Sequence, residues 1–292
     1  MKRTVLFLFT ALMVLSLASC KKDDSAGKSY GEAGKILVNG NLFDYTRGHL
    51  GEVLDGVLAD AGDPNAIESL VWKGGSISGE DIDYLRSKLK KSLKEADLRE
   101  ASFFVSSAKY ATGLETQAKA SVESEHDVPI ALFRDFDKLE RVALGRVGQI
   151  GSFSISNCPV LKDFSVEKVK EIGYCAFITS GIEEIRFPEG LTNFKEEAFY
   201  GAALRKVDLP STVTAFFDNT FICYKKTSGL VEVVCRAKTP PVVTHGTELN
   251  DQGNVFNRVR DDLVIRVPKG SVDAYKNAPL WSEHAAAITA IE

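Results

Sequence analysis

The sequence of 292 residues contains few of the patterns from which chemistry can be inferred. Its four histidines lie far apart and show none of the paired spacings that hold zinc: His49, His126, His245 and His284. It has no P-loop, no dinucleotide fingerprint and no Gly-x-Ser-x-Gly nucleophile elbow. The net charge of −4 does not indicate a nucleic-acid-binding surface. We therefore expect no enzymatic activity, no cofactor, no metal site and no nucleic-acid partner.

Calcium-binding patterns are missing as well. The pairs Asp81/Asp83 and Asp135/Asp137 are each separated by one residue, but the further oxygen ligands and the glycine of a calcium loop do not follow. Ser78 precedes Asp81 by three residues and begins an apolar pattern of helical spacing. We therefore predict that Asp81 lies at a helix N-terminus, where negative charge is stabilised by the helix dipole.

Long apolar runs are absent except for residues 5–17, which follow the basic pair Lys2 and Arg3. This run is too short to span a bilayer comfortably, so residues 1–19 are predicted to be an export leader. The leader ends in Leu17-Ala18-Ser19-Cys20, which resembles a bacterial lipobox. The resemblance implies that Cys20 carries the lipid and anchors the protein in the membrane. The alternative is an ordinary secretory leader with a cysteine at this position by chance.

Residues 20–34 are polar and are predicted to form a flexible tether. The segment Lys21-Lys22-Asp23-Asp24 resembles the export signal of surface lipoproteins in Bacteroidota-type bacteria. That resemblance implies a lipid-anchored protein of the outer membrane that faces the cell exterior. A location facing the periplasm is the alternative.

The rest of the chain is dominated by an internal repeat, in which an apolar residue is followed by apolar residues three and five positions later. Five copies follow one another: Leu139-Val142-Leu144, Leu161-Phe164-Val166, Ile182-Ile185-Phe187, Leu204-Val207-Leu209 and Leu230-Val233-Cys235. The first four begin 22, 21 and 22 residues apart, and the fifth begins 26 residues after the fourth. Alternating apolar residues bury one face of a short strand, so each copy predicts a strand of a parallel sheet.

A second apolar cluster follows each strand and ends in a phenylalanine, at Phe177, Phe199 and Phe221. One unit cannot bury its apolar side alone, so neighbouring units must stack. We therefore predict that these three phenylalanines form a column in a shared core.

The repeat also divides the chain. Residues 35–66 contain apolar residues at helical spacing and are predicted to be an N-terminal helical cap. Residues 67–262 are predicted to be the repeat region, with an irregular insert at about 103–136, because 46 residues separate the strand beginning at Leu93 from that at Leu139. Residues 263–292 are predicted to be a C-terminal cap in which Trp281 covers the last core layer.

Together these units resemble the BspA-like leucine-rich-repeat surface proteins. The likeness is carried by residues 182–199 and 204–221, by the opening around Ile67, and by the ending Val267-Pro268-Lys269-Gly270-Ser271-Val272-Asp273-Ala274-Tyr275 with Trp281. It implies an α/β-type repeat solenoid, a right-handed coil with a parallel β-sheet face, a short helical or irregular convex side, and caps at both ends. It also implies a surface role in adhesion or in binding host molecules. The insert and Cys235, at a position usually held by a bulky apolar residue, depart from the pattern.

The variable residues of the predicted strands should point outward and form a continuous face. The candidate ligand-binding residues are Arg141, Asp163, Glu184, Arg186, Arg205, Lys206 and Asp208. These side chains are of mixed charge with no aromatic ring, which suits an unidentified protein ligand, such as a host surface or matrix protein, better than a glycan. Arg186 and Arg205 are the preferred anchors, because guanidinium groups are frequent in interfaces. A solvated face without a ligand is equally open, and Tyr110 and the segment 224–226 are alternative contact sites.

Two further alternatives stay open. The chain could be an accessory lipoprotein that scaffolds an outer-membrane complex instead of an adhesin. The four cysteines beyond Cys20 could form two disulfides in three possible connectivities, but their positions inside repeat units favour free buried thiols: Cys158, Cys175, Cys223 and Cys235.

Overall fold

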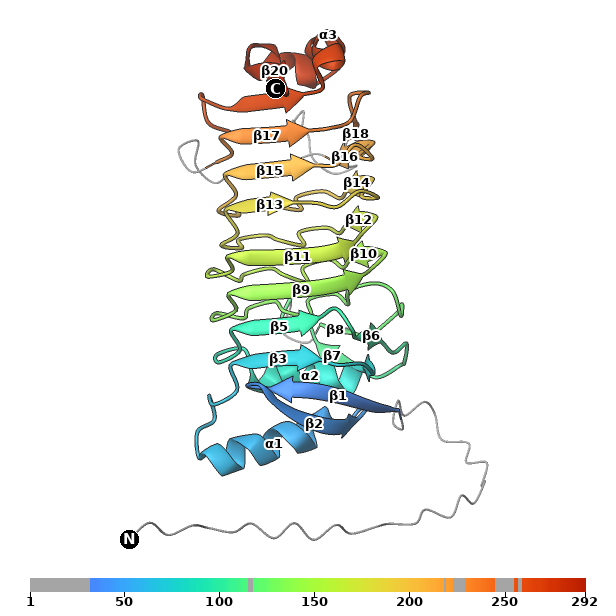
Figure 1. Cartoon of the computed structure of the whole chain (residues 1–292), viewed down its shortest axis with the longest axis vertical. Coiled ribbons are helices and arrows are strands. Elements are labelled where there is room, and N and C mark those ends of the chain that lie inside the picture. Colours follow the sequence, from blue (N-terminus) through green and yellow to red (C-terminus); the bar gives the residue numbers. More distant parts are fainter. Residues whose placement is uncertain (1–31, 115–117, 218, 223–228, 245–254, 257–258) are drawn as a thin grey trace.

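A computed structural model describes residues 32–114, 118–217, 219–222, 229–244, 255–256 and 259–292. These residues form an elongated stack of coils with the N-terminal elements at one end and the C-terminal elements at the other (Figure 1). Cys20, the leader, residues 20–31 of the predicted tether and the segment 224–226 lie outside the described residues. The last part of the predicted tether is wrong, because Ala33 and Gly34 already belong to the first strand.

One side of the stack is a ladder of parallel strands. It contains β3 (Ser69–Trp72), β5 (Glu95–Leu98), β9 (Arg141–Arg146), β11 (Asp163–Lys168), β13 (Glu184–Arg186), β15 (Lys206–Leu209), β17 (Glu232–Cys235) and β19 (Val264–Val267). The strands pair in register with their neighbours, for example Val142 with Phe164 and Val207 with Val233. Val142, Val207 and Ile265 are fully buried. The predicted strands and their inward faces are therefore confirmed.

The strand ladder was predicted to be one continuous sheet, but it consists of two sheets. β11 is the last strand of a six-stranded sheet and β13 the first strand of a five-stranded sheet. The break coincides with the one repeat of 21 residues and with a change in strand length, because β13 ends at Arg186, two residues before Pro188, whereas β11 continues to Lys168. Phe164 and Val166 on β11 are consequently only half-buried.

The second side of the coils was predicted to be helical or irregular, and this prediction is wrong. It is a second parallel ladder made of β10 (Gln149–Ile150), β12 (Glu171–Ile172), β14 (Asn193–Phe194), β16 (Ala215–Phe217) and β18 (Val242–Thr244). One apolar residue of each of β10, β12, β14 and β16 points into the core and is completely buried: Ile150, Ile172, Phe194 and Phe216. Two residues per coil are enough to continue the backbone hydrogen bonding from one coil to the next, and no helix is needed.

A turn closes each coil on its third side. It contains two residues with positive φ, and both recur every 22 residues: Ala131, Phe153, Cys175, Glu197 and Asn219 in one column, and Asp135, Asn157, Thr179 and Gly201 in the other. Backbone amides in these turns donate to the next coil, for example Phe177 N to the carbonyl of Ala198 at 2.8 Å. Such hydrogen bonds offset the cost of the left-handed backbone in residues other than glycine.

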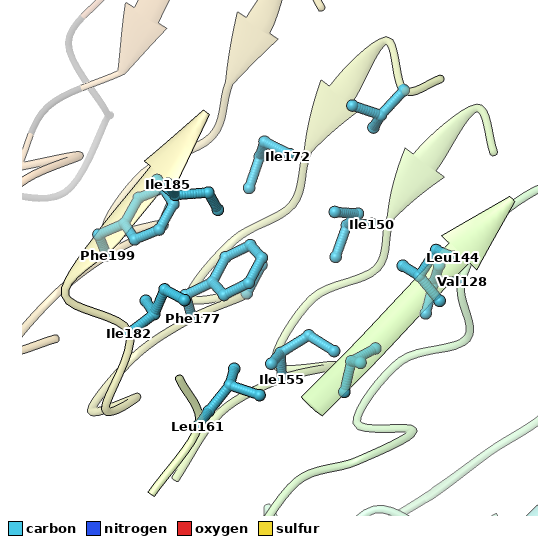
Figure 2. Close-up of a cluster of buried hydrophobic side chains, with 14 of the residues drawn as sticks. Val128, Leu144, Ile150, Ile155, Leu161, Ile172, Phe177, Ile182, Ile185 and Phe199 are labelled. Atoms are coloured by element: carbon cyan, nitrogen blue, oxygen red, sulfur yellow. The ribbon is translucent and has the colours of Figure 1, made fainter. Parts of the chain in front are cut away.

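The core between the three sides contains the predicted column of phenylalanines, two of which, Phe177 and Phe199, lie among buried aliphatic side chains in Figure 2. The rings of Phe177 and Phe199 stack with 4.8 Å between their centroids and 3° between their planes. Phe199 and Phe221 follow at 5.5 Å and 19°, and Phe221 and Phe256 at 5.9 Å and 9°. Phe177, Phe199 and Phe221 are almost completely buried. The column prediction is confirmed.

The N-terminal cap was predicted to be helical, but it contains a β-hairpin as well as a helix. The helix α1 (Leu50–Ala61) is preceded by a hairpin of β1 (Ala33–Val38) and β2 (Asn41–Thr46), and β1 pairs antiparallel with β3. Asn39 and Gly40 form the two-residue connection and both have positive φ, 48° and 83°. Asn-Gly is a strong hairpin signal in sequence, so this element could have been predicted.

The helix α2 (Gly79–Lys88) replaces the turn side in the first coil, and its N-terminus is the predicted one. The hydroxyl of Ser78 accepts from the amide of Asp81, and the carboxylate of Asp81 accepts from the amide of Ser78 at 3.0 Å. The same carboxylate accepts from the amides of Gly48 and Leu50 at 3.0 and 3.1 Å. Asp81 therefore caps the start of both helices.

The insert contributes no strand to the main ladder, since β5 pairs directly with β9. It contains β6 (Ser102–Phe103), which pairs with β4 (Ser76–Ile77), and a small hairpin of β7 (Tyr110–Ala111) and β8 (Lys119–Ala120). Tyr110 is fully buried and its hydroxyl donates to the carbonyl of Ile130 at 2.9 Å. The interpretation of Tyr110 as an exposed contact residue is therefore wrong, because the insert packs its ring inward.

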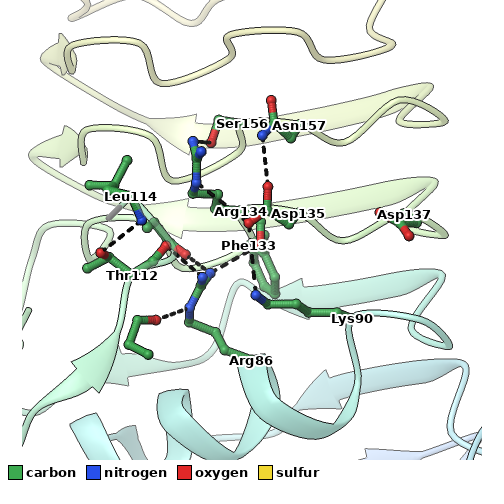
Figure 3. Close-up of polar contacts among 12 residues, drawn as sticks. Arg86, Lys90, Thr112, Leu114, Phe133, Arg134, Asp135, Asp137, Ser156 and Asn157 are labelled. Carbon is green, nitrogen blue, oxygen red and sulfur yellow. Dashed lines mark hydrogen bonds and ion pairs between the residues drawn. The ribbon is translucent and has the colours of Figure 1, made fainter. Parts of the chain in front are cut away.

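Arg86 of α2 fixes the insert to the stack (Figure 3). Its buried guanidinium donates to the carbonyls of Ala111 and Thr112 in the insert, at 2.5 and 2.7 Å. It also donates to the carbonyls of Ala131 and Arg134 in the next turn. Burial lowers the pKa of Arg86, while Asp135 nearby raises it. Oriented carbonyl dipoles thus replace the water that this cation loses.

The C-terminal cap contains the short 3-10 helix η2 (Lys269–Ser271), α3 (Val272–Asn277), η3 (Trp281–Ala287) and β20 (Ile288–Ala290), which pairs with β19. Trp281 lies over the core with its ring 6.2 Å from Phe216 and 4.8 Å from Tyr275. Its indole nitrogen donates to the carbonyl of Pro241 at 2.9 Å. The predicted role of Trp281 as the cover of the last core layer is confirmed.

Three of the cysteines are free and buried: Cys158, Cys175 and Cys235. This confirms the preference for buried thiols at these positions, while Cys223 lies outside the described residues. The thiol of Cys235 is 3.2 Å from the hydroxyl of Tyr275. Cys235 therefore fills its core position together with the cap tyrosine, which accounts for the small residue in this repeat.

Candidate ligand-binding face

The predicted ligand-binding residues all lie on the strand face or directly before a strand. Five of them are exposed and two, Lys206 and Asp208, are half-buried. The parallel register brings them into columns that run along the stack, since Arg141 lies beside Asp163 and Glu184 beside Lys206. The face is thus a set of charged columns with one position per coil.

The N-terminal part of the face is neutralised by its own ion pairs. Arg141 donates to Glu95 at 2.9 Å on one side and to Asp163 at 3.2 Å on the other. These three residues belong to β5, β9 and β11, so a single arginine bridges three coils. Exposed pairs of this kind contribute about 0–1 kcal/mol each, so they orient the side chains more than they stabilise the fold.

The C-terminal part of the face contains a second bridge, centred on Glu232 of β17. Its carboxylate lies 2.7 Å from the ammonium of Lys206 and 2.7 Å from the guanidinium of Arg266. Hydrogen bonds from Lys206 and then from Arg266 lower the pKa of Glu232. The hydrogen bond to Glu232 raises the pKa of Lys206. Lys206 is therefore engaged within the face.

Asp208 is shared between two arginines in an unequal way. Arg236 binds it through two parallel hydrogen bonds, both 2.8 Å long. Arg186 approaches the same carboxylate only to 3.6 Å, and 76% of its side chain is exposed. A bidentate pair is stronger than a single contact at 3.6 Å, so Arg236 is the main partner of Asp208. Arg186 is therefore a cation that a partner could engage with little loss of internal contacts.

Arg205 and Glu184 are the remaining members of the predicted set. Both are exposed, and no ion pair among the described residues involves either of them. The backbone of Arg205 is nevertheless fixed, because its amide donates to the carbonyl of Glu183 at 2.7 Å and its carbonyl accepts from Val231 at 2.8 Å. Arg205 thus presents an exposed side chain from a hydrogen-bonded backbone position.

Four residues that complete these bridges were not predicted: Glu95, Glu232, Arg236 and Arg266. Glu95 begins β5, and the other three lie in or directly after β17 and β19. The repeat pattern places the outward positions of Leu230-Val233-Cys235 and of Leu263-Ile265-Val267 on the same face as the earlier ones. The sequence therefore contained the signal, and extending the face to these strands would have found them.

The described residues contain no group of three or more histidine, cysteine or acidic side chains that could hold a metal ion. Asp135 and Asp137 lie instead among cations and an amide, since Asp135 accepts from Asn157 at 2.8 Å and Asp137 pairs with Lys91 (Figure 3). In the described part of the chain, no helix is both long and apolar enough to cross a membrane.

Stacked coils of about 22 residues with a parallel strand on one side define a leucine-rich-repeat protein. Residues 126–229 match the family of BspA type leucine rich repeat regions in six copies, and this part of the chain belongs to that family. The match begins inside the segment predicted to be an irregular insert. Val128 bridges to Ile150 and Ala131 occupies a repeat turn, so the insert ends earlier than predicted. No curated protein matches the chain.

Proposed function

We propose that this protein is a surface-displayed lipoprotein whose leucine-rich-repeat solenoid binds a protein ligand through its strand face. The observation that carries the proposal is the unequal sharing of Asp208, which leaves the guanidinium of Arg186 exposed. Arg205 is exposed as well, directly before the neighbouring strand β15, and no ion pair among the described residues involves it. Arginine side chains that can be desolvated without breaking strong internal pairs are typical anchors of protein interfaces.

The rigidity of the face supports the same role. Its strands are hydrogen-bonded to their neighbours within each of the two sheets, and its other charges are fixed by bridges such as Glu95–Arg141–Asp163. A preorganised surface loses little conformational entropy when a partner binds. Mixed charges at fixed spacing can also match a complementary protein surface and discriminate against others.

The experiment compares the purified full chain with the double variant Arg186→Ala/Arg205→Ala in surface plasmon resonance on immobilised collagen I, collagen IV and laminin. We expect at least one of these matrix proteins to bind and the double variant to bind at least about tenfold more weakly, as for the loss of one or two anchor residues. The matched control is Arg146→Ala/Lys168→Ala, which removes two exposed cations from neighbouring coils outside the proposed anchor site. Equal weakening by both double variants would contradict a defined site and indicate general charge attraction.

The lipid anchor and its orientation need a separate test. The lipobox-like end of the leader supports acylation of Cys20. In cells fed a labelled fatty acid, we expect label in the parent chain, none in Cys20→Ala, and loss of the chain from intact cells on treatment with protease. Protection of the chain in intact cells would place it facing the periplasm. Crosslinking to an outer-membrane protein without any matrix binding would instead favour an accessory scaffold.

A further inference from the structure

A shallow pocket lies away from the strand face, where the second ladder passes into the turns. It has a volume of about 340 Å³ and is lined by Gln149, Ser152, Tyr174, Lys195, Glu196 and Phe217. These residues come from four consecutive coils, because each coil supplies one short strand of the ladder and the turn that follows it. The pocket is therefore elongated along the stack.

Two aromatic rings are offered to a ligand in this pocket. Tyr174 is 40% exposed, in contrast to the completely or almost completely buried rings of Phe177, Phe199 and Phe221. Phe153 contacts the ring of Tyr174 at 5.3 Å with an interplanar angle of 86°, and so holds it in place. Phe217 is half-buried, and the ammonium of Lys195 lies 5.4 Å from the centre of its ring. Fixed, partly exposed rings bind flat apolar surfaces.

The polar groups that line the pocket together with the rings favour a neutral partner. Gln149 and Ser152 can each donate and accept hydrogen bonds, Lys195 donates and Glu196 accepts. Lys195 is already paired with Glu171 at 3.2 Å, so its charge is compensated within the protein. An anionic ligand would meet the carboxylates of Glu171 and Glu196. Neutral hydroxyl groups, which both donate and accept, match this set of partners.

The spacing of the rings fits a linear chain of sugars. The registers of Ile172 with Phe194 and of Phe194 with Phe216 place Tyr174 and Phe217 two coils apart along the stack. Strands in a ladder are about 4.8 Å apart, so two steps amount to about 10 Å. A pyranose unit in an extended chain has roughly the length of one step. We propose that this pocket binds a neutral oligosaccharide along the stack, with one sugar ring stacked on Tyr174 and another close to Phe217.

The site is separate from the one proposed for a protein ligand. The strand face carries charges and no exposed ring among its predicted contact residues, whereas this pocket offers rings together with compensated charges. An open, shallow pocket buries only part of a sugar chain, so weak binding is expected.

The test is saturation-transfer NMR and titration of the full chain in detergent micelles with cellotetraose, maltotetraose, mannotetraose and chitotetraose. We expect at least one of these neutral tetrasaccharides to bind. Tyr174→Ala and Phe217→Leu should each weaken that binding about tenfold, which is the effect of losing one ring contact and its burial. Tyr174→Phe keeps the ring and should bind within about threefold of the parent chain. Val160→Ser, an exposed apolar residue elsewhere on the stack, serves as the matched control and should change nothing.

Circular dichroism and thermal melting of each variant separate loss of the site from loss of the fold. Binding that survives Tyr174→Ala in a folded variant overturns the location, and the absence of binding by all four sugars overturns the ligand class. Binding of a polyanionic glycan such as heparin in place of the neutral sugars also overturns it. The variant Arg186→Ala/Arg205→Ala should keep its sugar binding, so failure of one proposal leaves the other intact.

Discussion

Replacing Phe199 by alanine tests the core on which the stack depends. Phe199 is 2% exposed and is the middle ring of the column, with centroids of Phe177 at 4.8 Å and Phe221 at 5.5 Å. The rings of Phe187 and Phe194 lie at 6.2 and 6.3 Å. Removing a buried phenylalanine ring costs about 3–5 kcal/mol, because the lost transfer free energy is joined by the cavity left behind.

The number of ring partners places this variant at the upper end of that range. Each aromatic pair adds about 0.5–1.5 kcal/mol beyond its buried area, and Phe199 loses four. We expect Phe199→Ala to lower the free energy of unfolding by about 5 kcal/mol, a large part of the 5–15 kcal/mol of a typical domain. Urea unfolding followed by circular dichroism measures this loss through the shift of the midpoint at constant slope.

Two comparison variants distinguish the loss of ring packing within the column from the effect of removing any phenylalanine side chain. Phe199→Leu keeps most of the volume and should cost about 1–3 kcal/mol. Phe164→Ala removes a half-buried ring that contacts, among the rings of the described residues, that of Phe177 at 4.9 Å, so it should cost less than Phe199→Ala. Because each coil contacts only its neighbours, hydrogen exchange should accelerate first in the coils of β13 and β15 and last in the N-terminal cap. A loss below about 1.5 kcal/mol for Phe199→Ala would refute a core held together by stacked rings.

Three further predictions concern single contacts. Arg86→Lys should detach the insert from the stack, because one ammonium group cannot reach all the carbonyls that the Arg86 guanidinium binds. Limited proteolysis within residues 103–125 should therefore become faster. An unchanged rate of cleavage would contradict this role. Gly181→Ala should lower the free energy of unfolding by about 1–3 kcal/mol, because its Cβ would lie 2.2 Å from the carbonyl oxygen of Pro159. In the same urea assay, Gly56→Ala on α1, whose Cβ would meet no atom within 4 Å, should raise the free energy of unfolding by about 0.5–1 kcal/mol. The pKa of Glu232 is lower in the folded than in the unfolded state, so its stabilising contribution is present above the unfolded pKa and is lost as the pH falls through the folded pKa. The melting temperature, measured from pH 7 to 3, should therefore fall less steeply with decreasing pH in Glu232→Gln than in the parent protein. Equal slopes would contradict the bridge.

The parts of the fold that could be predicted from sequence are those in which every coil repeats the same requirement. The strand positions and the column of Phe177, Phe199 and Phe221 follow from apolar residues that must face one shared core. The break between β11 and β13 could not be predicted in this way, because it depends on a one-residue change in spacing and on Pro188. The hairpin at Asn39-Gly40 had a sequence signal that the helical pattern after it obscured.

The candidate face could be predicted only in part, because an outward residue is constrained by its neighbours on adjacent coils and not by a common core. The period identifies Arg186 and Lys206 as outward residues on neighbouring strands. It does not reveal that Glu232 engages Lys206, or that Arg236 occupies Asp208 and leaves Arg186 exposed, since these outcomes depend on distances between side chains of different coils. In a stack of repeats, the inward-facing positions can therefore be predicted from the repeat period alone. Function resides in the outward positions, where each pair of neighbouring coils selects which charges remain available to a partner.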